Sequence, residues 1–129
     1  MGGTSDERAV SLSSGVEVSR ALREAGHEVV AVDTVRGVLP PREEELLRQG
    51  GVRRAPPTAD ELRGLDESST VALTRDPALG AIDVFFEALH GGSGEDGTVQ
   101  ALLDVAGVPY TGSDRLGCSL AMDKEVSKR

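Results

Sequence analysis

The side chains best suited to chemistry gather around one glycine-rich segment. It reads His90-Gly91-Gly92-Ser93-Gly94-Glu95-Asp96-Gly97. Its Gly-x-Gly-x-x-Gly spacing formally fits the fingerprint of a dinucleotide-binding turn. Two carboxylates at this place would repel a pyrophosphate, which a helix N-terminus otherwise attracts. The residues alone leave two interpretations open: a tight turn in which Asp96 caps a helix, or a site for a cationic ligand.

A helix and a buried strand are predicted near the start of the chain. Residues 11–25 carry apolar side chains at the i, i+3, i+4 and i+7 spacing, and the pattern stops at Gly26. The apolar run 29–32, closed by Asp33, is typical of a strand covered on both faces in a parallel sheet. The glycine turn at residues 2–5 is typical of one that leaves a first strand, but only Met1 precedes it, so we expect the first strand of the sheet to be missing.

The stretch 34–81 is the least informative. The acidic run 43–45 predicts the solvated start of a helix, and residues 70–73 predict a weak strand. No function is readable here.

Strand and helix patterns alternate again in the second half. Residues 82–89 predict a strand that runs into His90, and two helices are expected at 99–106 and 116–122. The alternation predicts an α/β fold with an open, mostly parallel sheet and flanking helices. Ligands of such sheets bind beyond the carboxyl ends of the strands, where His90 would lie.

The composition excludes several classes of partner. The chain has 14 Lys plus Arg against 22 Asp plus Glu, a net charge of -8, with only two Phe and one Tyr. This charge repels nucleic-acid backbones and anionic membrane surfaces, and so few aromatic residues offer no stacking platform for bases. A single cysteine, Cys118, excludes an internal disulfide and favours a reducing compartment. With no apolar run long enough for a membrane span, we expect a cytoplasmic protein.

Longer motifs resemble the D-alanine-D-alanine ligases. Residues 90–101 fill the family pattern HGxxGEDGxxQ, and residues 109–113 fill the PYTGS-like turn that follows it. The opening at 2–11 is similar to GGTSxEREVS, with Ala9 where Glu is common, and 122–124 is similar to MDK. The resemblance implies a Rossmann-like substrate-binding domain over 1–112. It also implies that 113–129 is the truncated start of an ATP-grasp domain.

The resemblance also implies a reaction and its site residues. These ligases use ATP to join two D-alanines through an acyl phosphate, in peptidoglycan synthesis. The resemblance implies that Glu7 binds the α-amino group of the first D-alanine. It also implies that Val10 and His90 line the same substrate site and that His90 is the active-site histidine. Lys124 contacts nucleotide phosphate. The Mg²⁺ ligands are expected from later domains, so we expect the isolated chain to be inactive. Members of the family are often dimers, so the resemblance also allows a homodimer of the intact enzyme.

Structural interpretations stand beside these roles. Glu7 fits a solvated helix-start acid, His90 a satisfied structural histidine, and Lys124 an exposed terminal lysine. We further hypothesise that Glu95 holds the His90 ring in one tautomer.

Ser11 and Ser113 fit cap and turn residues better than nucleophiles, and Cys118 fits a small packing residue.

Two alternatives from other classes also stay open. A non-catalytic small-ligand or dinucleotide-binding module is the alternative to the ligase, and a remnant of a longer gene is a third interpretation.

Overall fold

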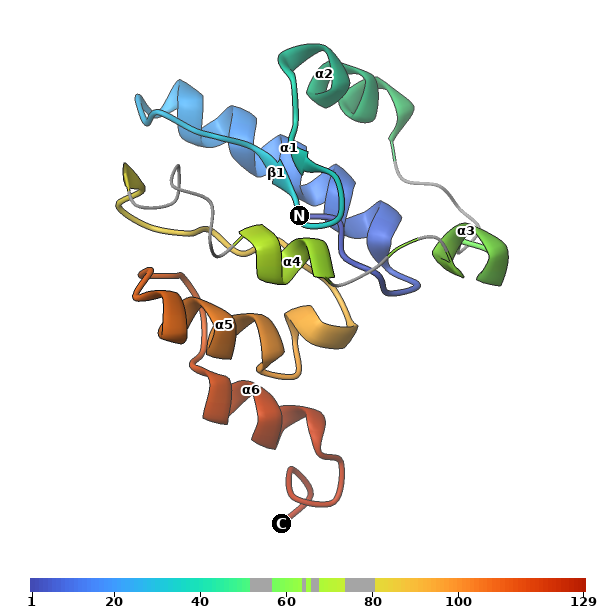
Figure 1. Ribbon diagram of the computed structural model, residues 1–129, viewed down its shortest axis with the longest axis vertical. Coiled ribbons are helices and arrows are strands. Elements are labelled where there is room, and N and C mark those ends of the chain that lie inside the picture. The colour runs from blue at the N-terminus through green and yellow to red at the C-terminus, as the bar shows by residue number, and fades with distance from the viewer. Residues whose placement is uncertain (52–56, 64, 66–67, 74–80) are drawn as a thin grey trace.

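The computed structural model describes residues 1–51, 57–63, 65, 68–73 and 81–129 (Figure 1). The helices are α1 (Arg8–Glu24), α2 (Pro41–Gly50), α3 (Ala59–Arg63), α4 (Ser68–Leu73), α5 (Thr98–Ala106) and α6 (Arg115–Met122), with a short 3-10 helix η2 (Gly92–Gly94). The strands are β1 (Val32–Asp33) and β2 (Gly37–Val38). The described residues therefore form a mixed helix and strand domain of the α/β kind.

The sheet is smaller than the sequence predicts. β1 pairs antiparallel with β2, with Val32 opposite Val38. Among the described residues, this two-stranded antiparallel sheet stands in place of the expected open parallel sheet. The predicted strand at 29–32 enters a ladder only at its last residue. Ala31 and Val32 are buried, but Val30 is 51% exposed, so the expected burial on both faces is wrong for this run. Ladder pairing also depends on a partner strand that local sequence does not specify.

Two parallel backbone contacts supplement this sheet. Met1 lies along β1, where its terminal nitrogen donates to the carbonyl of Val32 at 3.0 Å and its own carbonyl accepts from Thr34 at 3.0 Å. Phe85 forms an isolated parallel bridge with Tyr110. Within the part of the chain that the structure describes, the predicted strand at 82–89 is thus represented by a single bridge, at Phe85.

The helix predictions fare better than the strand predictions. α1, α5 and α6 confirm the expected helices within three residues at each end, and α2 confirms the helix start at the acidic run. The expectation that this whole run is solvated is wrong, because Glu44 is only 8% exposed and pairs with Arg23. The expected strand at 70–73 is wrong, because these residues belong to α4. A short apolar run has no distinguishing periodicity, so β-branched Thr70 and Val71 misled the interpretation.

The apolar core lies where α1 meets the amino-terminal residue and β1. Buried apolar side chains cluster there, flanked by partly buried ones: Met1, Val16, Ala31 and Leu39, then Leu12, Leu47 and Ala88. Gly15 allows the close approach, since a Cβ atom on it would lie 2.5 Å from the Cβ of Met1. α1 is therefore packed tightly against the segment that precedes the Gly2-Gly3 turn.

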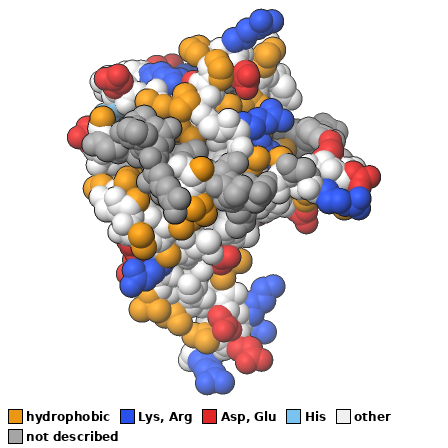
Figure 2. Space-filling view, viewed as in Figure 1, with side chains coloured by type: hydrophobic (Ala, Val, Ile, Leu, Met, Phe, Trp, Pro, Cys, Tyr) orange, Lys and Arg blue, Asp and Glu red, His pale blue; other side chains and the backbone are white. Residues whose placement is uncertain are grey.

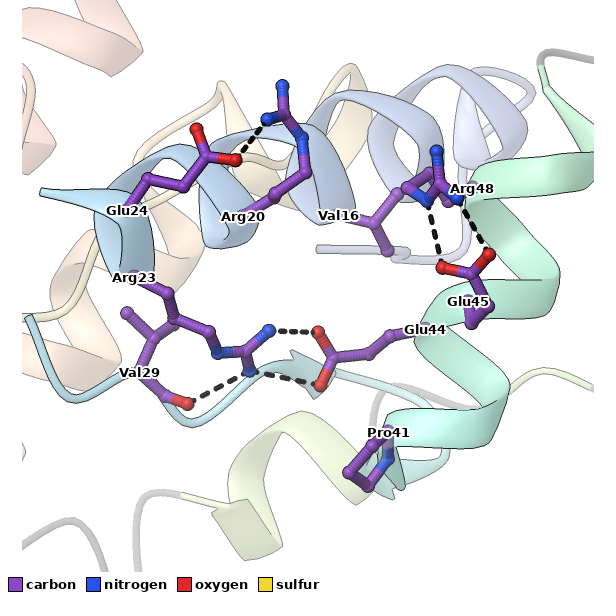
Figure 3. Close-up of a pocket in the computed structure, with 9 residues that line it drawn as sticks. All are labelled: Val16, Arg20, Arg23, Glu24, Val29, Pro41, Glu44, Glu45 and Arg48. Carbon is purple, nitrogen blue, oxygen red and sulfur yellow. Dashed lines mark hydrogen bonds and ion pairs between the residues drawn. The ribbon is translucent and has the colours of Figure 1, made fainter.

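An ion pair fastens α1 to α2. Arg23 donates to both carboxylate oxygens of Glu44, at 2.6 and 3.0 Å, and to the carbonyl of Val29 at 3.0 Å. These residues line one side of a pocket of about 710 Å³ between the two helices (Figure 3). On the other side, Arg20 and Arg48 pair with glutamates of their own helices. The charges lining the pocket are thus engaged with one another.

α6 packs against α5 at one end of the molecule. It lies at the end opposite α1 and α2, next to the C-terminus (Figure 1). Hydrophobic side chains are visible at this end in Figure 2, and Leu116 and Leu120 of α6 are exposed. Within the described ranges, no helix has the length and apolar character to cross a membrane.

Candidate functional site

One face of α1 and the loop before it hold the segment that ends at His90. The hydroxyl of Ser5 donates to the carbonyl of His90 at 2.5 Å, and that of Ser11 donates to the carbonyl of Ala88 at 2.7 Å. The hydroxyl of Ser14 lies 3.1 Å from Nε2 of His90. These three contacts fix both the backbone and the imidazole ring at the end of the segment.

The carboxylate of Glu7 meets the residue that follows His90. Glu7 is the N-cap residue of α1, and its side chain is exposed. A Cβ atom on Gly91 would lie 2.8 Å from Oε2 of Glu7, and Gly91 has a φ of +68°. A glycine is therefore needed here both for the backbone angle and for the space that the carboxylate occupies. The structure brings Glu7 and His90 to the same place on the molecule.

The hydrogen bonds of Ser14 bear on the tautomer of the His90 ring. The Ser14 hydroxyl is within hydrogen-bonding distance of the carbonyls of Val10 and Ser11, at 3.0 and 3.2 Å. A hydroxyl has one proton, so when it donates to either carbonyl it must accept from His90. His90 then carries a proton on Nε2, and Nδ1 is the ring nitrogen left for a ligand.

The other two predicted site residues lie differently. Val10 is 39% exposed and lies on the same face of α1 as Glu7 and Ser14, since positions three and four apart are neighbours on a helix. Lys124 is exposed and belongs to the segment that follows α6. That segment lies at the far end of the molecule from α1 (Figure 1). The structure brings Glu7 to the residue that follows His90 and places Val10 on the same helix face as Glu7, but it does not bring Lys124 to them.

A buried ion pair positions the start of α1. Arg8 donates to both carboxylate oxygens of Asp33, and its Nη1 also donates to the carbonyl of Gly3 at 2.8 Å. Asp33 is 1% exposed and also accepts from the backbone of Val35. Because Arg8 follows Glu7 directly, this ion pair fixes the backbone from which the Glu7 side chain extends.

Sequence reasoning missed Asp33 and Ser14 and misjudged Ser11. Ser11 is not a helix cap: it is fully buried within α1, where it accepts from the nitrogen of Gly2 at 2.7 Å. A usable signal existed for Ser14, which follows Glu7 by two helical turns and so shares its face. Asp33 carried a weaker signal, as a carboxylate placed directly after a buried strand.

The glycine-rich segment forms a turn and a helix start. Oδ1 of Asp96 accepts from the nitrogen of Thr98 at 2.9 Å, just before α5. A Cβ atom on Gly97 would lie 2.5 Å from the carbonyl oxygen of Arg115, so this glycine permits close contact between α5 and α6. A carboxylate already occupies the helix N-terminus, where a pyrophosphate would have to bind. In the described residues, no hydrogen bond links Glu95 to the His90 ring.

These features define a class: an α/β domain in which the first helix and a glycine turn bring an acid and an imidazole to the same place. Residues 1–113 match the family described as D-ala D-ala ligase N-terminus. The chain belongs to this family.

Individual relatives agree with the family match. The chain is 39% identical to a D-alanine-D-alanine ligase of Pediococcus pentosaceus, over 98% of this chain and 40% of that protein. It is 40% identical to one of a Marinomonas species, over 99% and 31%, and 41% identical to one of Halorhodospira halophila, over 100% and 30%. The chain thus spans less than half the length of these relatives.

Proposed function

We propose that this chain is the amino-terminal, first-substrate-binding part of an ATP-dependent D-alanine-D-alanine ligase. Residues 1–112 would form its substrate domain, and 113–129 the beginning of the ATP-grasp domain. The end of the family match at residue 113 supports this division. The parallel contacts of Met1 with β1 and of Phe85 with Tyr110 support an open, mostly parallel sheet in the intact domain.

The observation that carries the proposal is the convergence of Glu7 and His90. An exposed carboxylate packed on Gly91 is suited to the ammonium group of an amino acid, through a charge-assisted hydrogen bond. His90 lies one residue away with Nδ1 available, so it is suited to the carboxylate end of the same molecule when the ring is doubly protonated. Val10 would line the space between the two charges.

These residues bind and orient; the bond-forming chemistry requires the other substrates. In the proposed reaction ATP phosphorylates the carboxylate of the first D-alanine, and the amine of the second displaces phosphate to form the peptide bond. Glu7 contributes by fixing the ammonium end, which places the reacting carboxylate. His90 contributes a positive or hydrogen-bonding group next to charge that develops on the carboxyl oxygens.

The nucleotide and metal parts of the site lie outside this cluster. In the part of the chain that the structure describes, no group of three or more His, Cys, Asp or Glu side chains could hold a metal ion. The residues here therefore do not fit an Mg²⁺ site, and we derive no step through the metal. Lys124 would contact nucleotide phosphate as a flexible point charge. We further propose a cytoplasmic location and a homodimeric intact enzyme.

A chimaeric enzyme tests the proposal. This chain would replace the aligned first 30% of the Halorhodospira halophila ligase. We expect the chimaera to form D-alanyl-D-alanine and to release phosphate in a D-alanine-dependent way. Glu7→Gln in the chimaera should lower kcat/KM for D-alanine about 30-fold or more, because a hydrogen bond to a charged group is worth about 2 kcal/mol.

Glu17→Gln provides the matched control. Glu17 is exposed on the same helix, where it pairs with Arg20 at the surface. This substitution should leave kcat/KM within about twofold, because surface pairs contribute little. An active chimaera that tolerates Glu7→Gln as well as it tolerates the control would refute the assignment of Glu7.

A further inference from the structure

Glu87 and Gln100 form a polar pair beside the glycine turn that the proposed ligand site does not use. Nε2 of Gln100 donates to Oε2 of Glu87 at 2.7 Å and to the carbonyl of Gly94 at 2.8 Å. Gln100 is only 2% exposed, and Glu87 is partly buried. One carboxamide therefore connects the segment before His90 to the turn after it.

Each member of the pair also has a buried oxygen without a partner in the described structure. These atoms are Oε1 of Glu87 and Oε1 of Gln100. With Glu87 ionised, both atoms are acceptors, and neither can satisfy the other. Buried acceptors without donors cost free energy, so such a pair calls for a donor. A single proton on Oε1 of Glu87 would turn one of the two acceptors into the donor that the other lacks.

We propose that Glu87 takes up a proton from solvent and donates it to Oε1 of Gln100, and that the resulting doubly hydrogen-bonded acid-amide pair positions the Gly92–Gly94 turn beside His90. The only bond formed is the O–H bond of the carboxylic acid. Nε2 of Gln100 continues to donate through its two hydrogens, one to Glu87 and one to Gly94. Glu87 and Gln100 are thus positioning residues, and neither contacts the ligand.

The surroundings of Glu87 favour the neutral acid. Burial raises the pKa of Glu87 to about 6 from 4.5, and the nearby charge of Glu95 also raises it. The hydrogen bond from Gln100 and the Met1 ammonium act in the opposite direction, and burial lowers the pKa of the Met1 amine itself to about 6. Cys118, the other titratable group that interacts with this carboxyl, has its pKa raised by burial and by Glu87. The second hydrogen bond of the acid-amide pair, from Glu87 to Gln100, is therefore expected to form as the pH falls through about 6.

The sign of the stability effect follows from the direction of this shift. The pKa of Glu87 is higher in the folded chain than in the unfolded chain, so the folded state holds the proton more tightly. The stabilising contribution is complete below about pH 4.5 and is lost as the pH rises through about 6. The turn should be held most firmly in the same acidic range.

The first measurement is made on the unmodified 129-residue chain. The side-chain carboxyl carbon of Glu87 is followed by ¹³C NMR from pH 4 to pH 8, together with the amide signals of Gly92 and Gly94. We expect the Glu87 carbon to titrate near pH 6 and the two glycine amides to follow the same midpoint. A Glu87 midpoint near 4.5, or glycine amides that ignore the Glu87 titration, would overturn the proposal. No ligand is added, so the result is independent of the ligase assignment.

The second measurement uses a variant that imitates the protonated acid. Glu87→Gln supplies a permanent N–H donor to Oε1 of Gln100 and retains an acceptor for Nε2. Its amide signals at Gly92 and Gly94 should at pH 7.5 resemble those of the unmodified chain at pH 5, and its urea midpoint should exceed that of the unmodified chain at pH 7.5. Glu28→Gln, at an exposed position, should change neither. A Glu87→Gln chain less stable than the unmodified chain at pH 7.5 contradicts the acid-amide pair.

Discussion

The hydroxyl of Ser14 lies 3.1 Å from Nε2 of His90, in a contact that spans 76 positions of the sequence. Ser5 holds the carbonyl of the same histidine, and Glu7, between these serines, packs on Gly91. A single helix and the loop before it therefore position both charged ends of the proposed amino-acid site. The relative placement of acid and imidazole depends on how α1 sits on the segment that ends at His90.

Removing the Ser14 hydroxyl should release the His90 ring. Ser14→Ala deletes the acceptor for Nε2–H, and one such hydrogen bond is worth about 1 kcal/mol. We expect the chimaera that carries Ser14→Ala to show about a fivefold higher KM for D-alanine, and the imidazole ¹⁵N signals of His90 to move. Ser13→Ala, at the preceding position of α1, is the control. Unchanged imidazole signals in Ser14→Ala would show that the contact does not orient the ring.

The Arg8–Asp33 pair should be among the most sensitive positions in the fold. Asp33→Asn leaves the guanidinium of Arg8 buried without its counter-charge, which typically costs about 3 kcal/mol or more. Urea unfolding at neutral pH measures this loss. Asp60→Asn, which breaks the exposed pair with Arg63, should change the unfolding free energy by less than about 1 kcal/mol. Equal effects of the two substitutions would contradict the anchoring role of Asp33.

The Arg23–Glu44 ion pair, which joins α1 to α2, should contribute less to the free energy of unfolding than the buried Arg8–Asp33 pair. Arg23→Met removes both hydrogen bonds to Glu44, whose side chain is 11% exposed (Figure 3). We expect a loss of about 2 kcal/mol in the free energy of unfolding, because the Glu44 carboxylate is left largely buried and unpaired. Arg20→Met, on the same helix, breaks only pairs that are exposed and should cost about 0.5 kcal/mol or less. An equal loss of unfolding free energy for both substitutions would mean that the Arg23–Glu44 ion pair does not hold α1 and α2 together.

The isolated chain should not turn over ATP. Glu7 and His90 address the amino acid, whereas phosphoryl transfer requires groups that clamp the phosphates and a metal. A phosphate-release assay with D-alanine, ATP and Mg²⁺ should give the same rate with and without the chain. D-alanine-dependent phosphate release by the purified chain would show that it holds a complete site.

Several parts of this structure were predictable because their signals are local. The helices α5 and α6 follow from apolar periodicity, and Gly107 ends α5 in the left-handed conformation that glycine favours. The juxtaposition of Glu7 with His90 was expected only through family resemblance, since nothing local in either segment encodes the other. Their roles in binding remain predictions.

Other parts depend on contacts between distant positions. The partners of Ser14 and of Asp33 lie on segments far away in the sequence, so no periodicity reveals them. The strand at 82–89 is apolar enough to be expected, yet among the described residues it pairs only at Phe85, because ladders require a neighbouring strand in register. The Glu87–Gln100 pair was likewise not predictable from local sequence, because the fold of the intervening turn brings the two side chains together.

The most direct test of the site is a titration of the ¹⁵N-labelled chain with D-alanine. We predict that the largest chemical-shift changes fall on Glu7, Val10, His90 and Gly91, that α2 and the segment after α6 stay unchanged, and that Glu7→Gln removes the response while Glu17→Gln keeps it. Shift changes centred on α2 or α6, or a response at His90 that survives Glu7→Gln undiminished, would contradict the convergence of Glu7 and His90 on one amino acid.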